Sequence, residues 1–300
     1  MNHIEYIKNT IKGYVNENEI MANHTTLGVG GPADIFVDVT TELELSNLIS
    51  YLHTNNIPWT ILGDGTNLLV SDKGIRGTVI KLSGELKQIK VEDTKIIAGA
   101  GARISDVADI AAKNNLTGLE GVGTVPGTVG GAIVMNAGTH SGYIDVVTKR
   151  VGVVTNTGEI KVFSKEDCGF TYRNSLFQEN KELMVTWAEF SLTIGNGENI
   201  RNHLDGVRKH RAETQPKGKS AGCFFKNLPD RSAGKLIEDA GCKGMRLGGA
   251  LVSDIHANFI INDSNATAED LYKLAEQVRK KVKEKFDVEL KYEVRLLGEW

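Results

Sequence analysis

The segment Gly121-Val122-Gly123-Thr124-Val125-Pro126-Gly127-Thr128-Val129-Gly130-Gly131-Ala132 restricts the possible roles of this chain more than any other part of it. The residues stay small through Asn136-Ala137-Gly138, so few side chains remain to block a flat ring or a phosphate. A Gly-rich loop of this length is uncommon in a compact domain unless it has a function. We therefore predict a long ligand-binding loop from Gly118 to Gly142.

A second Gly-rich turn lies upstream, at Leu62-Gly63-Asp64-Gly65-Thr66-Asn67-Leu68-Leu69, where a predicted strand runs into small polar residues. Successive backbone N–H groups in such a turn can bind an anion, and the side chains of Thr66 and Asn67 add further donors. The pattern suits a pyrophosphate, but a simple hairpin turn explains the same residues equally well.

The common nucleotide and hydrolase signatures fail or are absent. Gly28-x-Gly30-x-x-Ala33 matches the dinucleotide-binding fingerprint by letter, but no strand is predicted before it and Pro32 lies inside it. The chain has no Walker A, HExxH or GxSxG sequence.

Three short segments carry reactive side chains, and each has an ordinary alternative. Arg173, beside Tyr172, can clamp a carboxylate, although such pairs are more often surface residues. Cys223 is flanked by small residues and could donate a proton, whereas a free cysteine is usually a small buried hydrophobe. Glu293 and Arg295 share one face of a predicted strand, either as part of a site or as a cross-strand ion pair.

The bulk composition is that of a globular protein in a reducing compartment. The chain is 40% apolar and 24% charged, and its net charge of -3 offers no basic surface for nucleic acid or an anionic membrane. Three scattered cysteines form no disulfide framework or metal motif. No signal peptide or membrane span is visible, so we expect a cytoplasmic protein without a metal.

Hydrophobic spacing predicts an α+β fold. The predicted helices cover residues 41–55, 104–114, 267–286 and a stretch from about 200 to before Pro216. The predicted strands cover residues 59–62, 68–70, 78–82, 96–98, 151–155, 160–163 and 185–193. The last helix has Thr267 and Asp270 as a capping box, and its predicted buried stripe is Leu271, Leu274, Val278, Val282 and Phe286.

The order of seven segments resembles the UDP-N-acetylenolpyruvoylglucosamine reductase (MurB) family. The segments are TTLGVGGPAD, LGDGTNLL, GVGTVPGTVGGAIVMNAG, YRNS, SAGCFFKN, HANFIIN and YEVRLLGE, and the resemblance covers residues 23–299. It implies a two-part FAD-binding domain of the vanillyl-alcohol-oxidase (PCMH) type, residues 1–82 and 83–197. A C-terminal α/β substrate-binding domain follows, residues 198–300, whose last strand returns to the active site.

The resemblance also implies roles for individual residues. Arg173 matches the residue that stabilises an enolate, Cys223 the proton donor, and Glu293 a carboxylate that assists near the same carbon. The implied neighbours of the substrate are Tyr172, Lys226, Asn227 and Arg295. The residues expected to hold non-covalent FAD are Leu62, Gly63, Asp64, Gly65, Thr66, Asn67, Leu68, Gly121, Val122, Gly123, Thr124, Pro126, Gly127, Gly130, Gly131, Asn136 and Ala137.

In this family NADPH reduces the flavin, which then passes a hydride to the enolpyruvyl methylene carbon of a UDP-sugar. The product is UDP-N-acetylmuramate, a peptidoglycan precursor. Many members carry serine where this chain has Cys223. A thiol with a pKa near 8.5 is mostly protonated at neutral pH, so it can donate the proton. The stretch between Tyr172 and Gly222 has no room for the extra substrate-covering loop of the longer family type, and we expect a monomer of the shorter type.

Two other functions remain open. An oxidase of the same flavin superfamily would consume oxygen without NADPH, and it could attach the flavin to His140, just beyond the Gly-rich loop. A non-catalytic flavin or nucleotide-sugar binding protein could keep the Gly-rich loops and lose the chemistry. The joint presence of Arg173, Cys223 and Glu293 favours the reductase over both.

Overall fold

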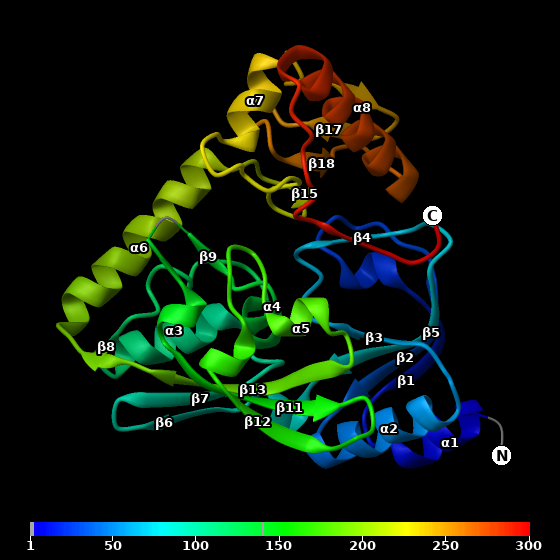
Figure 1. Ribbon diagram of the computed structural model, residues 1–300, viewed down its shortest axis with the longest axis vertical. Coiled ribbons are helices and arrows are strands. Elements are labelled where there is room, and N and C mark those ends of the chain that lie inside the picture. Colours follow the sequence, from blue (N-terminus) through cyan, green and yellow to red (C-terminus); the bar gives the residue numbers. More distant parts are fainter. Residues whose placement is uncertain (1–2, 140) are drawn as a thin grey trace. The chain divides into compact units, whose positions relative to one another are not determined.

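The computed structural model describes residues 3–139 and 141–300, which form two compact units (Figure 1). The first unit, unit 1, contains Ile35–Gly63, Gly77–Lys209 and the residues before 18. The second, unit 2, contains Asn18–Asp34, Asp64–Arg76 and His210–Trp300. Each unit has its own apolar core. The division of the sequence at residues 82 and 197 stays a prediction.

A five-stranded antiparallel sheet is the centre of unit 1. Its order is β12-β11-β13-β7-β6, with the strands β6 (Ile89–Glu92), β7 (Lys95–Gly99), β11 (Thr148–Thr155), β12 (Ile160–Ser164) and β13 (Leu183–Ser191). The predicted strands over 96–98, 151–155 and 160–163 are therefore confirmed. The strand predicted over 185–193 is confirmed as far as Ser191, where β13 ends.

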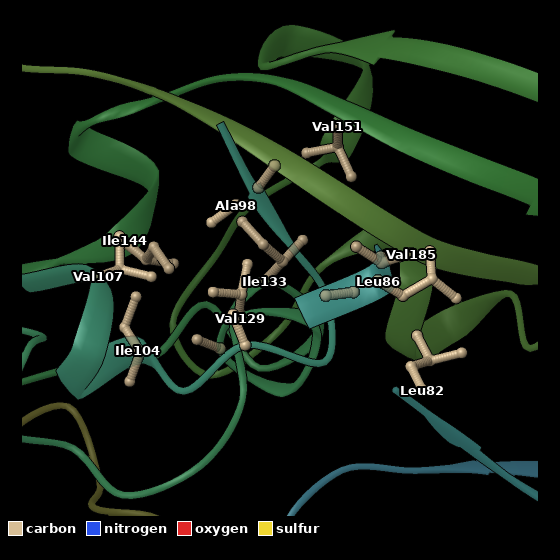
Figure 2. Close-up of a cluster of buried hydrophobic side chains, with 14 of the residues drawn as sticks. Leu82, Leu86, Ala98, Ile104, Val107, Val129, Ile133, Ile144, Val151 and Val185 are labelled. Atoms are coloured by element: carbon tan, nitrogen blue, oxygen red, sulfur yellow. The ribbon is translucent and has the colours of Figure 1, made fainter. Parts of the chain in front are cut away.

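The helices α3 (Ile104–Lys113) and α4 (Val129–Val134) cover one face of this sheet (Figure 1). Figure 2 shows Val107 of α3 and Ile133 of α4 among the side chains that pack with Ala98 of β7 and Val151 of β11. All four side chains are buried, which anchors both helices to the sheet.

The predicted unbroken loop from Gly118 to Gly142 is wrong in its middle, because α4 lies inside it. Thr128 caps this helix, since its side chain accepts a hydrogen bond from the Gly131 N–H at 3.2 Å. Two adjacent glycines and three β-branched residues disfavour a helix in isolation. Burial of Val129 and Ile133 outweighs that preference, and sequence patterns alone do not show such tertiary packing.

A second sheet of unit 1 has the order β1-β2-β5-β3. Its strands are β1 (Val15–Ile20), β2 (Pro32–Val39), β3 (Trp59–Leu62) and β5 (Ile75–Leu82). The helices α1 (His3–Thr10) and α2 (Glu42–Thr54) also belong to unit 1 and contact each other, and α2 contacts β11 of the first sheet. The predicted helix over 41–55 is confirmed, with Thr41 as its N-cap. The other elements of unit 1 are β8 (Leu116–Thr117), β9 (Gly138–Thr139), β10 (Gly142–Tyr143), α5 (Leu176–Glu179) and β14 (Thr193–Ile194); α6 (Gly197–Thr214) starts in it.

Unit 2 combines a four-stranded sheet, a two-stranded parallel pair and two helices. The sheet has the order β15-β18-β17-β16, with β15 (Lys219–Ser220), β16 (Arg246–Leu247), β17 (Ala250–Val252) and β18 (Ile260–Asn262). The pair joins β4 (Leu68–Val70) to β19 (Arg295–Leu297), and the helices are α7 (Ala233–Asp239) and α8 (Ala268–Phe286). Within residues 3–139 and 141–300, no helix is both long and apolar enough to cross a bilayer.

Helix α8 has the predicted capping box of Thr267 and Asp270. The carboxylate of Asp72 adds to this cap, because its two oxygens accept from the N–H groups of Ala268 and Glu269 at 2.9 and 3.0 Å. Four members of the predicted stripe are buried, and Phe286 is only partly buried against the same core. The cap therefore fixes where α8 begins, and the stripe fixes the face that it buries.

Glu44 joins the ends of α1 and α2 through a buried carboxylate. It accepts from the Lys12 N–H at 2.5 Å, and from the N–H and hydroxyl of Thr40 at 2.6 and 2.8 Å. Burial opposes ionisation of this carboxyl, but the hydrogen bonds outweigh it and lower the pKa of Glu44 below its ordinary 4.5.

Replacing Glu44 with Gln should lower the free energy of unfolding at pH 7 by about 1–3 kcal/mol, because an amide cannot accept all these bonds. A lowered folded-state pKa gives stability that is present above pH 4.5 and is lost as the pH falls through the folded-state value. Urea unfolding of both proteins across this range should therefore show the difference shrinking in acid. A difference that does not change with pH would contradict this account of Glu44.

Candidate functional site

The two Gly-rich motifs meet at Gly63 and Thr128 in unit 1. A side chain at Gly63 would place its Cβ 2.8 Å from the Thr128 hydroxyl oxygen, so these two backbones approach closely. The turn after Leu62 is not a hairpin, because β3 pairs with β5 whereas β4 pairs with β19. The alternative of a hairpin turn is therefore wrong.

Most glycines of the 121–138 segment are required by the packing of the protein itself. A Cβ at Gly121 would lie 2.7 Å from the Ser141 carbonyl, and one at Gly123 would lie 2.2 Å from the Ala108 Cβ. A Cβ at Gly130 would lie 3.0 Å from the Ala100 Cβ, and Gly127 has a φ of +126°. These glycines show that the chain folds tightly here, and they do not by themselves indicate a ligand.

Gly131 is different, because the fold gives no reason for a glycine there. It is exposed in α4, and among the residues that the structure describes its Cβ would meet only the Thr128 hydroxyl oxygen, at 3.5 Å. Glycine in a helix costs about 1 kcal/mol relative to alanine. A position that accepts this cost without a packing need is one where a ligand can approach the backbone.

Thr124, in the same segment, has a buried hydroxyl oxygen with no hydrogen-bond partner among the described residues. Buried polar groups are normally satisfied, and an exception calls for an explanation such as a bound group. Together with the bare surface of Gly131, this orphaned hydroxyl fits a polar planar cofactor such as FAD. Of the other predicted cofactor residues here, Val122, Asn136 and Ala137 are buried, whereas Pro126 is exposed.

Arg173 is held beside the same segment of unit 1. Its guanidinium donates to the Gly138 carbonyl at 2.7 Å and lies 5.8 Å from the centre of the Tyr143 ring. The backbone of Arg173 has a φ of +52°, in a turn closed by the Asn174 N–H donating to the Thr171 carbonyl. The Asn136 amide donates to that same Thr171 carbonyl at 3.0 Å.

Strained backbone of this kind costs of order 1–3 kcal/mol and often occurs at functional sites. Arg173 also lies 5.6 Å from the centre of the Tyr172 ring, as in the surface-pair alternative, so the strained turn favours a positioned cation and its role in the site stays a prediction. Its neighbour Tyr172, in contrast, is 46% exposed.

In unit 2 the turn residues 64–67 are held by two other predicted motifs. The Gly65 carbonyl accepts from the Thr26 N–H at 3.1 Å, and Thr26 belongs to the TTLGVGGPAD segment. The Asn67 side-chain amide donates to the Glu293 carbonyl at 3.1 Å, and the Asn67 carbonyl accepts from the Arg295 N–H at 3.0 Å. Leu68 begins β4, and Asp64 and Thr66 are half-buried in the turn.

Cys223 and Glu293 lie on adjacent backbone segments of unit 2. The Glu293 N–H donates to the carbonyl of Phe224 at 2.9 Å, and Phe225 forms an antiparallel bridge with Tyr292. Asn258 fixes the cysteine segment from its other edge, since its side chain both accepts from the Phe225 N–H at 3.0 Å and donates to the Phe225 carbonyl at 2.8 Å. The structure thus brings together two of the three predicted catalytic residues.

Cys223 is the cysteine suited to chemistry. Cys168 and Cys242 are fully buried, and burial raises the pKa of each, that of Cys168 to about 12. Cys223 is only partly buried, against a small cluster of Leu251, Phe259 and Ile261. This packing partly matches the ordinary alternative of a small hydrophobe, while the partial exposure leaves the thiol accessible, and the role of Cys223 stays a prediction.

Unit 2 also contains two half-buried arginines, Arg211, which interacts with Cys223, and Arg295, two residues after Glu293. Burial lowers the pKa of Arg295, and it lowers that of Arg211 against an opposing attraction from Cys223. Sequence reasoning placed Arg211 on a helix but did not single it out, and only its distance of twelve residues before Cys223 links the two in sequence. Asn227, a predicted substrate neighbour, accepts from the Ala233 N–H near the start of α7, and Lys226 pairs its N–H with the Lys291 carbonyl.

Comparison with known proteins identifies the family to which this chain is similar. A model described as an FAD binding domain matches residues 33–164, and one described as the UDP-N-acetylenolpyruvoylglucosamine reductase C-terminal domain matches residues 214–297. A protein named UDP-N-acetylenolpyruvoylglucosamine reductase from Caldanaerobacter subterraneus is 47% identical over 99% of this chain and 98% of its own length. One of the same name from Clostridium novyi is 43% identical over 96% and 94%.

Solved structures agree with these matches. The crystal structure of UDP-N-acetylenolpyruvylglucosamine reductase (MurB) from Thermus caldophilus has a TM-score of 0.82 and 37% identity, over 95% of this chain and all of that one. Physcomitrella patens BBE-like 1 has a TM-score of 0.50 at 14% identity, over 64% of this chain and 45% of its own, and that likeness shows the fold alone.

The fold and the first domain match define a flavoprotein with an FAD-binding domain of the PCMH type, which confirms the predicted fold class and the FAD cofactor. The C-terminal match and the near full-length identities narrow this class. The chain belongs to the UDP-N-acetylenolpyruvoylglucosamine reductase family.

Gly131 and Gly123 allow a matched test of the loop. In the absence of FAD, the free energy of unfolding of the Gly131→Ala protein should be higher than that of the wild type by up to about 1 kcal/mol, because alanine favours the helix. Its affinity for FAD should fall by about tenfold or more, since a methyl group would occupy the open backbone surface. Thermal unfolding and a flavin titration of the apoprotein measure the two effects.

The control, Gly123→Ala, should instead lose about 1–3 kcal/mol of stability through overpacking against Ala108. A stable Gly131→Ala protein with the FAD affinity of the wild type would show that this glycine does not face the cofactor.

Proposed function

We propose that this chain reduces UDP-N-acetyl-3-O-(1-carboxyvinyl)-glucosamine to UDP-N-acetylmuramate with NADPH as the reductant, a step of peptidoglycan precursor synthesis. The observation that carries the proposal is the near full-length family match, which is supported by the placement of Cys223 and Glu293 on adjacent segments joined by the bond from the Glu293 N–H to the Phe224 carbonyl. We propose further that the protein acts as a monomer in the cytoplasm, as the shorter family type.

The chemistry that a bound FAD would supply is hydride transfer, from NADPH to the methylene carbon of the enolpyruvyl group. The residues that would hold it are those of the turn 62–68 and of the segment 121–137, with Thr124 offering its orphaned hydroxyl and Gly131 its open backbone surface. The remaining chemistry belongs to side chains of this chain.

Arg173 stabilises the negative charge that develops on the substrate when its methylene carbon gains a hydride. That charge spreads onto the adjacent carboxylate as an enolate, and a fixed guanidinium lowers its energy without reorganising. The strained turn and the bond to the Gly138 carbonyl hold this guanidinium in one place before substrate arrives. Arginine suits this role because it presents paired donors to a carboxylate and stays charged.

Cys223 donates the proton that completes the reduction, and the Sγ–H bond breaks as the new C–H bond forms next to the carboxylate. Cys223 is only partly buried, so a bound substrate could reach its thiol. Glu293, on the adjacent segment, assists near the same carbon. Arg211 and Arg295 add positive charge in unit 2, which suits a substrate with a diphosphate and a carboxylate.

The oxidase alternative gains no support from these residues, because an alcohol or hydroxy-acid oxidase needs no proton donor at Cys223. The proposed attachment residue of that alternative, His140, lies outside the described residues.

The visible spectrum of the purified protein tests the two halves of the reaction separately. The flavin absorption bands should bleach when NADPH is added without oxygen, and they should return when the enolpyruvyl sugar nucleotide follows. A colourless protein that takes up no added FAD would overturn the proposal. A yellow protein that ignores NADPH and reacts with oxygen would support the oxidase.

Substitution of Cys223 tests the proton donor. The Cys223→Ala protein should be reduced by NADPH at the normal rate but should reduce the substrate about 100- to 10,000-fold more slowly, the usual contribution of a general acid. The Cys223→Ser protein should keep much of its activity, because a hydroxyl can donate the same proton. Stopped-flow absorbance separates the two steps, and full activity of Cys223→Ala would remove the thiol from the mechanism.

A further inference from the structure

Asn67 makes a contact that its predicted role does not explain. The resemblance places it among the FAD-binding residues, yet its side-chain amide donates to the Glu293 carbonyl at 3.1 Å. We propose that Asn67 is a positioning residue, which acts on the reaction by fixing the Glu293 peptide and hence the direction of the Glu293 carboxyl. This inference rests on the proposed function, and in particular on the role of Glu293.

The backbone pairing around Asn67 shows why a side chain is needed at this point. The parallel pair of β4 and β19 matches Leu68 with Arg295, and the Arg295 N–H donates to the Asn67 carbonyl at 3.0 Å. Glu293 lies two residues before that ladder begins, and its carbonyl accepts from the side-chain amide of Asn67. An amide N–H can serve here in the way that a backbone N–H serves within a ladder.

Glu293 is thereby fixed on both edges of its segment. Its N–H donates to the Phe224 carbonyl at 2.9 Å, next to Cys223, and its carbonyl accepts from Asn67. The neighbouring Val294 is 2% exposed in the core of unit 2. The Val294 N–H also donates to the Phe224 carbonyl, at 3.3 Å, so residues 293 and 294 form a bend held at one oxygen, and rotation of the Glu293 peptide would change the direction of its carboxyl.

A double-mutant cycle tests this inference. The Asn67→Asp side chain has the same shape, but it lacks the N–H donor and faces the Glu293 carbonyl with a negative charge. We expect this protein to reduce the substrate between about tenfold and a hundredfold more slowly, the effect of a displaced catalytic group. Because the turn 62–68 is also proposed to hold FAD, the two proteins are compared at saturating FAD, and the loss should then fall on the substrate step rather than on reduction by NADPH.

The decisive comparison is made in the Glu293→Gln background. Glu293→Gln keeps the backbone carbonyl and removes the carboxylate, so there is no longer a carboxylate to misplace. Adding Asn67→Asp to it should change the rate by less than about twofold, which is the scatter expected of a fully coupled pair. Asn67→Ala, which removes the donor without adding charge, should behave in the same way.

Ser71→Ala is the matched control. The Ser71 hydroxyl donates to the Glu299 carbonyl at the other end of the same strand pair, so its loss weakens the same ladder away from Glu293. We expect a lower unfolding temperature and an unchanged rate of substrate reduction. If Ser71→Ala slowed that step as much as Asn67→Asp, general loosening of the strand would explain both.

The outcomes separate this inference from the proposed function. A wild-type protein that cannot reduce the substrate would overturn the proposed function, and a fully active Glu293→Gln would remove the target on which Asn67 acts. If both behave as proposed, additive losses in the cycle would overturn the inference alone. If Asn67→Ala weakened FAD binding but reduced the substrate at the normal rate at saturating FAD, Asn67 would act in cofactor binding and not in positioning Glu293.

Discussion

Backbone hydrogen bonding along both edges of the segment 291–297 is the constraint on which unit 2 depends. One edge bonds to the cysteine segment, through the Phe224 carbonyl and the Lys226 N–H. The other bonds to Asn67 and to β4. Three stretches that are far apart in sequence are thereby held at fixed spacing, and each carries a residue assigned to the reaction. The carboxyl, the thiol and the turn of Asn67 keep their relative positions because the peptide groups between them are bonded.

In unit 1 the comparable constraint is close backbone packing. Glycines at 121, 123 and 130 let the segment lie against neighbouring backbone and alanine side chains, with no room for a Cβ. The same closeness leaves few side chains on this segment, which is why we propose it as the surface for a flat cofactor. At most positions of this segment, packing and the proposed cofactor binding both require glycine. At Gly131 packing does not require it, and binding is the reason that we propose.

Much of the fold could be predicted from periodicity and caps. The spacing of Leu45, Leu48, Ile49 and Leu52 identified α2, and the Thr267–Asp270 pair identified the start of α8. Helix α4 was not predicted, because its stability comes from the packing of Val129 and Ile133 on the sheet and not from the helix propensity of its residues. The rejected fingerprint at Gly28 leads into a strand, β2, and not into a helix, so its rejection is confirmed.

The residues of the candidate site could be predicted from the sequence, but the contacts between them could not. Arg173, Cys223 and Glu293 stand out once the family resemblance is accepted, whereas the bond from Asn67 to Glu293 spans 226 positions and has no local signature. Arg211 was missed for a similar reason, because one arginine among several on a charged helix gives no signal until the fold brings it to Cys223.

The pairing of β4 with β19 also determines when unit 2 can fold during synthesis of the chain. Residues 68–70 are synthesised early, and their strand partner, residues 295–297, comes near the end of this chain. Until then Leu27 and Leu69, both fully buried in the finished unit, have no completed core to enter. Contacts this distant in sequence form slowly, because a long loop must close before they are gained. Unit 2 therefore completes its core only after residues 295–297 have been synthesised, and its earlier apolar segments stay exposed in the nascent protein until then.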